Sequence, residues 1–177
     1  MNSESINAQK LKQTITKEGV SLYDLSMEHP LMVVFLRHFG CIFCKEALKE
    51  LSAKKAQLEM KGIKLVFVHM ADEDVADEYF SDYDLNTFYS ISDPGCKVYS
   101  DFGLVKGSFG QLFGLTVMIR GIQANMNGNA FSLKQIGDGF QMPGIFLINE
   151  GTIEESFIHN RVSDKPDYEN LISCCAA

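Results

Sequence analysis

The sequence predicts one α/β domain in which helices flank a central mixed β-sheet. Three short apolar runs, rich in β-branched or aromatic residues, are typical of strands covered on both faces: residues 31–38, 63–70 and 144–150. A helical pattern separates the first two runs, and strand, helix and strand in this order form a β-α-β unit. The length suits a single domain over residues 1–177, because a chain of this size buries roughly 70% of its unfolded surface.

The helical pattern after the first strand begins near Cys41 and ends near Gly62. Leu48, Leu51 and Leu58 recur on one face of this helix, whereas the lysine and glutamate side chains fall largely on other faces. Glycine readily adopts the left-handed backbone that commonly ends a helix, so Gly62 is the expected stop.

The second half of the chain contains further helix and turn signals. The acidic stretch at residues 71–83 is expected to form a helix, because carboxylates are favoured in a first helical turn. Residues 93–95 predict a turn, followed by a short helix that Gly103 ends. A hairpin turn at residues 149–151 joins the last two strands, and a final helix follows with Asp164 as its N-cap.

Two segments lie outside this regular pattern. Residues 1–20 are polar and are expected to form an N-terminal extension. Residues 104–130 predict an apolar helical insertion before the C-terminal hairpin, and Arg120 is the only charge between residues 108 and 126. One interpretation is a helix buried in the domain. A mobile lid or a dimer contact is the alternative, because interior glycines weaken a helix by up to ~1 kcal/mol each.

The charge balance excludes some classes of partner. The formal net charge is -7, with 16 basic and 23 acidic residues, which argues against sequence-independent binding to nucleic acid or to anionic lipid. The N-terminal residues lack the apolar run of a signal peptide, and no stretch reaches the ~20 apolar residues of a membrane span. We therefore expect a cytoplasmic protein, as a monomer or homodimer.

Two of the five cysteines, Cys41 and Cys44, straddle the expected turn from strand to helix. The free N–H groups and the dipole of a first helical turn favour a thiolate, and Arg37, His38 and Lys45 add positive charge nearby. A redox pair is the leading interpretation. The alternatives are two small core residues, or half of a zinc site, which would need four ligands.

A proline supports the redox interpretation. Pro143 directly precedes the apolar run at 144–150, and the thioredoxin fold places a cis proline there, opposite its Cys-x-x-Cys pair. An isolated bond to proline is cis in only ~5–6% of cases. In this architecture, the bond between Met142 and Pro143 is expected to be cis.

Four segments together carry a resemblance to a known family: "FLRHFGCIFCKE", "YSISDPGCKVYSDFGL", "GDGFQMPGIFLI" and "FIHNRVSDKPDYENLI". On these residues, which spread over 33–172, the chain resembles the thioredoxin-like AhpC/TSA antioxidant family, in its peroxiredoxin-like 2 or SelL-like branch. The resemblance implies a thioredoxin fold and thiol-based redox chemistry that reduces peroxides.

The resemblance leaves the nucleophile open. The Thr-x-x-Cys motif of peroxiredoxins superimposes Cys44 on their reactive cysteine, whereas thioredoxins attack with the first cysteine, here Cys41. Two groups that help peroxiredoxins to hold a peroxide are replaced: their proline falls at Arg37, and their later arginine falls in the segment around Pro143. Arg37 or Arg120 is a candidate substitute.

The histidines allow more than one interpretation. His38 is a candidate proton shuttle near neutral pH, although a satisfied, partly buried imidazole is an equally good interpretation. His69, or His159 with Asp164, would suit a hydrolase, but no Gly-x-Ser-x-Gly elbow accompanies them.

The remaining cysteines are weaker candidates. Cys96 follows the predicted turn and is interpreted as a bystander. Cys174 and Cys175 would either resolve an intermolecular disulfide or lie at a frayed helix end.

The predicted function is thiol-dependent reduction of a peroxide. Cys41, Cys44, Pro143, Arg37 and His38 are the expected site residues, with no metal or cofactor. An external thiol such as thioredoxin or glutathione would regenerate the pair. The alternatives are a thioredoxin-type protein disulfide oxidoreductase, or a non-catalytic thioredoxin-like module that binds or senses. The apolar insertion is expected to shape a site for an apolar hydroperoxide.

Overall fold

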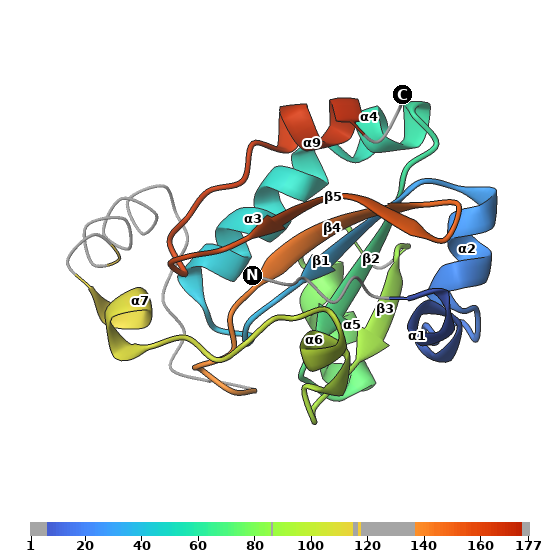
Figure 1. The fold of residues 1–177 in the computed structure, drawn as a ribbon. Coiled ribbons are helices and arrows are strands. Elements are labelled where there is room, and N and C mark those ends of the chain that lie inside the picture. The colour runs from blue at the N-terminus through green and yellow to red at the C-terminus, as the bar shows by residue number, and fades with distance from the viewer. Residues whose placement is uncertain (1–6, 86, 115–116, 118–136, 175–177) are drawn as a thin grey trace.

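A five-stranded mixed sheet lies at the centre of the computed structural model, which describes residues 7–85, 87–114, 117 and 137–174 (Figure 1). The strands follow the order β3-β2-β1-β4-β5 across the sheet. Their bounds are Leu31–Phe35 for β1, Lys64–His69 for β2, Tyr89–Ser92 for β3, Gly144–Asn149 for β4 and Thr152–Ile158 for β5. β1, β2 and β3 are parallel, whereas β4 is antiparallel to both of its neighbours.

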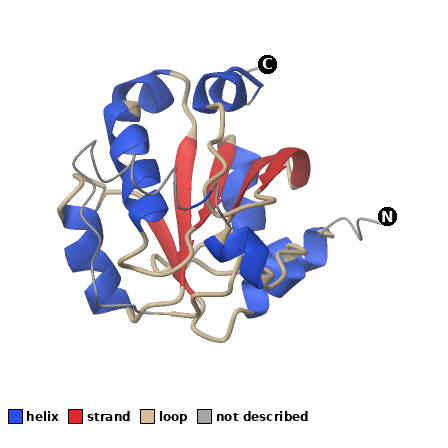
Figure 2. Ribbon diagram, turned by 90° about the vertical axis from the view of Figure 1, so that its left-hand side faces the viewer, coloured by secondary structure: helices blue, strands red, loops and turns tan. Residues whose placement is uncertain are grey.

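Helices cover both faces of this sheet, as Figures 1 and 2 show. Side chains from α3, α4, α5 and α9 pack on one face, and side chains from α1, α2 and α6 pack on the other. The helix bounds are Ala8–Gln13 for α1, Leu22–Glu28 for α2, Ile42–Ala53 for α3, Lys55–Met60 for α4, Glu73–Ser81 for α5, Lys97–Asp101 for α6, Phe109–Phe113 for α7 and Tyr168–Cys174 for α9. The predicted α/β class with a central mixed sheet flanked by helices is confirmed.

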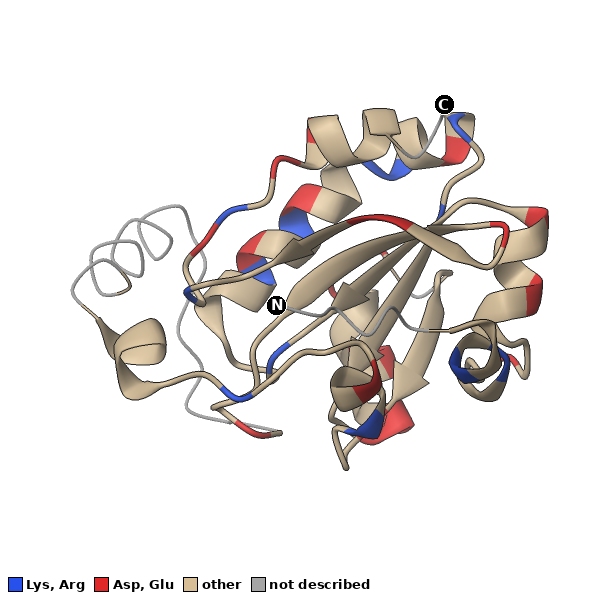
Figure 3. Ribbon diagram, in the orientation of Figure 1, with Lys and Arg blue, Asp and Glu red and all other residues tan. Residues whose placement is uncertain are grey.

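The two cores follow from the alternation of side chains along each strand. In β1, Met32 and Val34 face the α3 side, whereas Leu31, Val33 and Phe35 face the α1 side, and all five are buried. Charged residues lie mainly on the helices, in loops and on the edge strand β5 (Figure 3). The central strands β1 and β4 carry mostly buried apolar side chains. The sheet is therefore a rigid platform with both faces covered.

All three predicted apolar strands are present, but β1 is shorter than predicted. The N–H of Leu36 still donates to the carbonyl oxygen of Val68, at 2.9 Å. The N–H of Arg37 instead donates to the Sγ of Cys44, at 3.4 Å, so the strand ladder ends there. As a result, Arg37 and His38 lie beyond the strand.

The edge strand β3 has no counterpart among the predicted strands. It is only four residues long, and two of its residues are serines. It forms by pairing with β2, where Tyr89 lies opposite Val66. This pairing depends on a distant part of the chain, so no local apolar pattern indicates it.

The single helix predicted after the first strand is divided into α3 and α4. At Lys54 the backbone leaves the helical region, with φ of -98° and ψ of 3°. Its N–H is shared between the carbonyl oxygens of Glu50 and Leu51, at 3.2 and 3.1 Å, which tightens this turn. Gly62, with φ of 69°, follows α4 as the predicted stop.

The other predicted turns and helices agree with the structure. α5 occupies the acidic stretch, and Gly103, with φ of 74°, follows α6. The β4–β5 hairpin turns at Glu150 and Gly151, whose φ angles are 48° and 72°. Left-handed backbone at both positions is the geometry of the tightest hairpin turns.

The last helix begins three residues later than predicted. The side chain of Asp167 accepts a hydrogen bond from the N–H of Asn170, at 3.1 Å, so Asp167 caps α9. Asp164 was the expected cap, but its carboxylate instead accepts the N–H groups of Asn160 and Arg161, each at 2.8 Å. Asp164 therefore stabilises the turn after β5.

Only part of the predicted insertion at 104–130 lies within the described residues. Leu112 on α7 is buried, but Phe109 and Phe113 are 71% and 53% exposed, and their rings contact each other in a tilted arrangement. The expectation of a buried helix is therefore wrong for α7. The rest of the insertion, including Arg120, lies outside the described residues.

The described part of the N-terminal segment packs against the sheet. Leu11 on α1 and Leu22 on α2 are fully buried. The N–H of Lys17 donates to the carbonyl oxygen of Ser90, so this segment also contacts the edge strand β3. Across the described ranges, no helix has the length and apolar character needed to cross a bilayer.

The observed cap of α9 leads to a stability prediction. Asp167→Ala should lower the free energy of unfolding by about 1 kcal/mol, because one N–H of the first helical turn loses its acceptor. Asp167→Asn keeps a side-chain oxygen and serves as the control. Urea denaturation of the two variants checks this, and equal losses in both would contradict the assigned cap.

Candidate functional site

The two cysteines lie where the chain passes from β1 into α3. Gly40 has φ of 107°, a backbone region that other residues rarely adopt, and it turns the chain toward the helix. Cys41 is the N-cap of α3, as predicted, and its N–H donates to the carbonyl oxygen of His38 at 3.1 Å. Its thiol makes no capping hydrogen bond. Cys44 lies one turn further along the helix.

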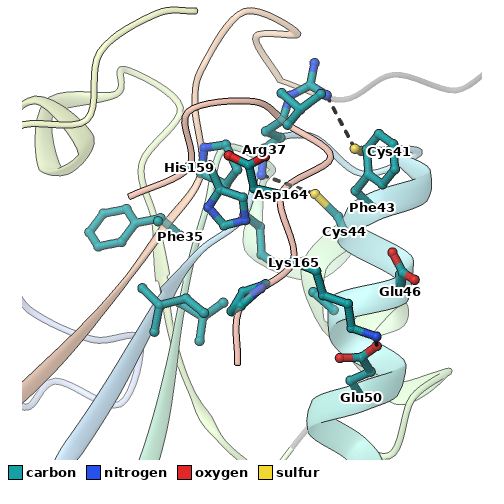
Figure 4. Close-up of a pocket in the computed structure, with 18 of the residues that line it drawn as sticks. Phe35, Arg37, Cys41, Phe43, Cys44, Glu46, Glu50, His159, Asp164 and Lys165 are labelled. Atoms are coloured by element: carbon teal, nitrogen blue, oxygen red, sulfur yellow. Dashed lines mark hydrogen bonds and ion pairs between the residues drawn. The ribbon is translucent and has the colours of Figure 1, made fainter. Parts of the chain in front are cut away.

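Both sulfur atoms contact Arg37. The guanidinium Nη1 of Arg37 donates to the Sγ of Cys41 at 3.5 Å, and the backbone N–H of Arg37 donates to the Sγ of Cys44 at 3.4 Å (Figure 4). Cys41 and Cys44 are 4% and 5% exposed, and both are free thiols in this structure. A single residue thus fixes the position of both sulfurs.

The environment makes the two thiols chemically different. A hydrogen bond from the Cys44 thiol, together with the charge of Arg37, holds the pKa of Cys41 well below its usual value despite burial. The same hydrogen bond and burial raise the pKa of Cys44 well above its usual value. These directions favour a thiolate at Cys41 and a thiol at Cys44.

Arg37 is held by contacts on both sides. Its side chain is buried, and its Nη2 donates to the carbonyl oxygen of Gly139. Its Nε is also buried and, among the described residues, has no hydrogen-bond partner. Asp138 lies in the same loop as Gly139, but its carboxylate binds Lys106 at 2.7 Å. One N–H of a buried cation next to Cys41 is therefore unused.

A small pocket encloses the cysteine pair (Figure 4). It lies between α3, the end of β1, the start of β4 and the segment after β5. Its free volume is about 40 Å³, which has room for about three water molecules. Its lining combines apolar side chains, the two cysteines and several charged side chains. The lining residues are Val34, Phe35, Leu36, Arg37, Cys41, Phe43, Cys44, Glu46, Ala47, Glu50, Pro143, Gly144, Ile145, His159, Val162, Asp164, Lys165, Pro166 and Tyr168.

Pro143 lines this pocket, but the expectation of a cis bond is wrong. The bond between Met142 and Pro143 is trans. The N–H of Met142 donates to the carbonyl oxygen of Val105 at 3.2 Å, and the side chain of Met142 is buried. With the trans bond, Met142 makes these contacts and Pro143 still lines the cysteine pocket.

The segment after β5 covers one side of the pocket and is tied to two helices. Lys165 forms an ion pair with Glu50 of α3. Gln111 of α7 donates from its side chain to the carbonyl oxygen of Asn160, at 2.8 Å, and accepts the N–H of Val162 at its own carbonyl oxygen, at 3.2 Å. α7 is thereby connected to the wall of the pocket.

The histidines occupy different positions. His38 is half-buried, its Nδ1 lies 3.3 Å from the carbonyl oxygen of Phe39, and burial lowers its pKa. It is close enough to Cys41 for the two groups to interact electrostatically. Burial lowers the pKa of His69 and of His159 to about 4, so both are neutral near pH 7.

Sequence reasoning did not place His159 at the cysteine site. His159 and Asp164 both line the pocket, as Figure 4 shows, yet they face a cysteine pair and not a serine nucleophile. The only sequence signal was that both residues follow β5, the hairpin partner of the strand that begins after Pro143. His69 stacks on Phe39 and does not line the pocket.

The other described cysteines lie away from this pocket. Cys96 packs in the core on the opposite face of the sheet, where its Sγ is 3.3 Å from the Sδ of Met70. Cys174 is exposed at the end of α9, and Cys175 lies outside the described residues. Within the described ranges, no three histidine, cysteine or acidic side chains gather as a metal site would require.

Solved structures with a similar fold are redox proteins. Peroxiredoxin Q of Xanthomonas campestris aligns with a TM-score of 0.63 at 16% identity, over 91% of this chain and 87% of that chain. A putative thiol:disulfide interchange protein DsbE of Chlorobium tepidum aligns with a TM-score of 0.57 at 19% identity, over 93% and 92%. These likenesses establish a thioredoxin-like α/β fold of the kind found in peroxiredoxins.

The family follows from the sequence comparisons. The model of the AhpC/TSA family matches residues 4–156, and the chain belongs to this family. The prostamide/prostaglandin F synthase of Danio rerio is 25% identical over 179 residues, which cover 97% of this chain and 86% of that protein. The synthase of Homo sapiens is 25% identical over 147 residues, which cover 80% and 71%. The sequence-based family assignment is confirmed, and the chain is an oxidoreductase.

The contacts of Arg37 lead to a prediction about thiol reactivity. Alkylation by iodoacetamide, followed against pH, should give Cys41 a lower apparent pKa than free cysteine and should give Cys44 a higher one. Arg37→Gln should raise the apparent pKa of Cys41, because removing a neighbouring positive charge disfavours the thiolate. Intact mass and peptide mapping identify the labelled cysteine.

Lys64→Gln removes a charge at the start of β2, opposite Leu31 at the far end of β1 from the cysteines, and is the control for this experiment. It should leave both titrations unchanged. An unchanged Cys41 titration in Arg37→Gln would contradict the assigned role of the guanidinium.

Proposed function

We propose that this chain reduces peroxides with a dithiol–disulfide cycle of Cys41 and Cys44. The contact between the buried Arg37 guanidinium and the Cys41 sulfur, inside a pocket that also holds Cys44, is the observation that carries the proposal. The Cys41 thiolate attacks one peroxide oxygen, the O–O bond breaks, and the departing oxygen takes up a proton. The Cys41 sulfenic acid then reacts with the Cys44 thiol to give a disulfide and water.

Cys41 is the better candidate for the nucleophile. Its pKa is lowered and its sulfur faces a side-chain cation, whereas the pKa of Cys44 is raised and its sulfur accepts a backbone N–H. The thiolate is the attacking form, so the cysteine with the lowered pKa attacks first, and Cys44 must lose its proton before it attacks the sulfenic acid. The first cysteine of the pair then attacks, as in thioredoxin. The Thr-x-x-Cys pattern of peroxiredoxins would instead make the second cysteine the nucleophile.

Arg37 replaces the arginine with which peroxiredoxins hold a peroxide and which this chain lacks before β4. Its Nη1 contacts the Cys41 sulfur, and its buried Nε–H has no acceptor among the described residues, so it can donate to a peroxide oxygen. Hydrogen bonds from a fixed cation to an oxygen that gains charge lower the barrier of such reactions. The other candidate, Arg120, lies outside the described residues.

His38 and Pro143 have supporting roles in this proposal. The imidazole of His38 is neutral near pH 7 and close to Cys41, so it can accept or return a proton during the cycle. Pro143 forms part of the pocket wall and carries no N–H, so it offers no competing donor to the sulfurs.

An apolar hydroperoxide is the proposed substrate class. The pocket has room for the peroxide group but not for a large ligand, so the rest of the substrate would lie against its apolar rim. Phe43 lines the pocket and also packs against the cluster of Leu112, Val117, Met142 and Val162. The relatives named as prostamide/prostaglandin F synthases also suggest a lipid-like substrate.

Regeneration requires an external thiol, with thioredoxin and glutathione as the candidates. An odd number of cysteines suits a reducing compartment, and the cytoplasm is the proposed location.

Disulfide exchange with another protein is the second candidate function. The first cysteine at a helix N-cap, with the lowered pKa, is the arrangement that a thioredoxin-type exchanger uses. In this version Cys41 attacks a substrate disulfide, one substrate sulfur leaves as a thiolate, and Cys44 then displaces the second substrate sulfur from Cys41.

The peroxide cycle predicts distinct products for two cysteine variants. When the reduced protein meets hydrogen peroxide, wild type should form a disulfide, Cys44→Ser should accumulate a sulfenic acid, and Cys41→Ser should lose fast oxidation by more than about 100-fold, because it lacks the nucleophile. Stopped-flow rates with intact mass at each time point measure this.

The same variants separate the candidate functions. If peroxide oxidises all three proteins slowly while wild type reduces a protein disulfide through Cys41, the exchange function is correct and the peroxide function is wrong. If Cys44→Ser alone abolishes fast oxidation, Cys44 is the nucleophile.

The apolar rim predicts a preference between peroxides. Phe43→Ala should lower kcat/KM for cumene hydroperoxide about tenfold, because the loss of one apolar contact is worth about 1.4 kcal/mol. The rate with hydrogen peroxide, which has no apolar group, should stay within about twofold. Phe109→Ala removes an exposed ring outside the pocket lining and is the control. Equal losses with both peroxides would contradict an apolar substrate site.

A further inference from the structure

Arg37 is a buried cation whose guanidinium contacts the sulfur of Cys41. Its side chain is 7% exposed. Across the described ranges of the chain, no carboxylate forms an ion pair with it. Its Nη2 binds the neutral carbonyl oxygen of Gly139, and its Nη1 binds the sulfur of Cys41. The lowered pKa of Cys41 and the contact of its sulfur with Nη1 make a Cys41 thiolate the hydrogen-bonded counter-charge of Arg37 in the reduced protein.

The nearby carboxylates have other partners. Asp138 interacts electrostatically with Arg37 but forms its ion pair with Lys106. The Asp164 carboxylate accepts two backbone N–H groups, and the Glu50 carboxylate binds Lys165. His38 has a pKa lowered by burial and is neutral near pH 7. A change at Cys41 therefore changes the charge balance around Arg37 directly.

Disulfide formation removes that counter-charge without removing the cation. A disulfide sulfur carries no charge, whereas a guanidinium stays protonated at any pH that the fold survives. A buried charge without a partner is unfavourable, so the oxidised site gains from binding an anion. The free volume of about 40 Å³ beside the pair and the unused Nε–H give such an anion space and a donor.

We propose that loss of the Cys41 charge turns the Arg37 guanidinium into a binding site for one small monovalent anion, such as chloride. The anion occupies the space next to the Cys41 sulfur and accepts hydrogen bonds from the guanidinium. The redox form of this proposal rests on the dithiol–disulfide cycle proposed above. The site itself requires only that Cys41 be uncharged.

Anion binding and the redox state are then linked. An anion that binds the disulfide form and not the dithiol form stabilises the disulfide by mass action. Once chloride exceeds its dissociation constant, each tenfold rise in chloride should shift the dithiol–disulfide equilibrium about tenfold toward the disulfide.

The first experiment measures chloride binding by the excess NMR line width of chloride. Reduced wild type at pH 8 should give little broadening, whereas Cys41→Ser and the wild-type disulfide should give clear, saturable broadening. Cys41→Ser/Arg37→Gln should lose it, and Cys41→Ser/Arg37→Lys should keep part of it because a cation remains. Circular dichroism shows whether each variant is folded.

Cys96→Ser is the matched control for the cysteine substitution. It removes a thiol on the other face of the sheet and, in the reduced protein, should leave chloride broadening at the wild-type level. Equal broadening by reduced wild type and Cys41→Ser would overturn the proposal, as would unchanged broadening in Cys41→Ser/Arg37→Gln.

The second experiment measures the redox equilibrium in a glutathione buffer, with chloride exchanged for gluconate at constant ionic strength. The disulfide fraction of wild type should rise with chloride, and that of Arg37→Gln should not. An equal chloride response in both proteins would overturn the linkage.

The two experiments also separate this proposal from the redox cycle. If no disulfide forms between Cys41 and Cys44 but Cys41→Ser binds chloride through Arg37, the anion site is supported and the cycle fails. If the disulfide forms and neither it nor Cys41→Ser binds chloride, the cycle stands and the anion site is overturned.

Discussion

The contact of Arg37 with both cysteine sulfurs is the constraint on which the rest of the site depends. Its backbone N–H leaves the strand ladder for the Cys44 sulfur, and its guanidinium reaches the Cys41 sulfur. One residue therefore ends β1, orients the first turn of α3 and sets the charge beside the thiolate. The carbonyl oxygen of Gly139 holds the far side of the guanidinium, so a loop far along the chain completes the site.

The sheet fixes the position of Arg37, which follows the end of β1. β1 is a central strand between parallel β2 and antiparallel β4, and both of its faces are covered. The end of such a strand cannot move without disturbing two ladders, so the turn that follows it is held firmly. The start of β4 delivers Pro143 and Gly144 to the same end of the sheet. Parallel and antiparallel neighbours thus bring two distant segments to one pocket.

Much of this arrangement could be predicted from the sequence, because its signals are local. The apolar runs, the glycine after α4 and the cysteine at the N-cap of α3 each follow from a few adjacent residues. The edge strand β3 could not be predicted, because it is stabilised by its pairing with β2 and its own side chains show no strand pattern. The cap of α9 was misplaced because Asp164 and Asp167 are equally good caps in isolation, and only the turn after β5 occupies Asp164.

The site was predicted less completely than the fold. The cysteine pair, Arg37 and Pro143 were found from motif and position, and the structure gathers them in one pocket. The trans bond at Pro143 and the presence of His159 could not be read from the sequence, since both depend on how the segments before β4 and after β5 pack. Contacts between segments more than 100 residues apart, such as that of Arg37 with Gly139, leave no local pattern.

The two hydrogen bonds of Gln111 have a mechanical consequence. They attach α7, which carries the exposed rings of Phe109 and Phe113, to the backbone of Asn160 and Val162. Val162 is itself part of the pocket wall. Leu112 of α7 also packs in one cluster with Val162, so a displacement of this helix would displace the pocket wall beside the cysteines as well.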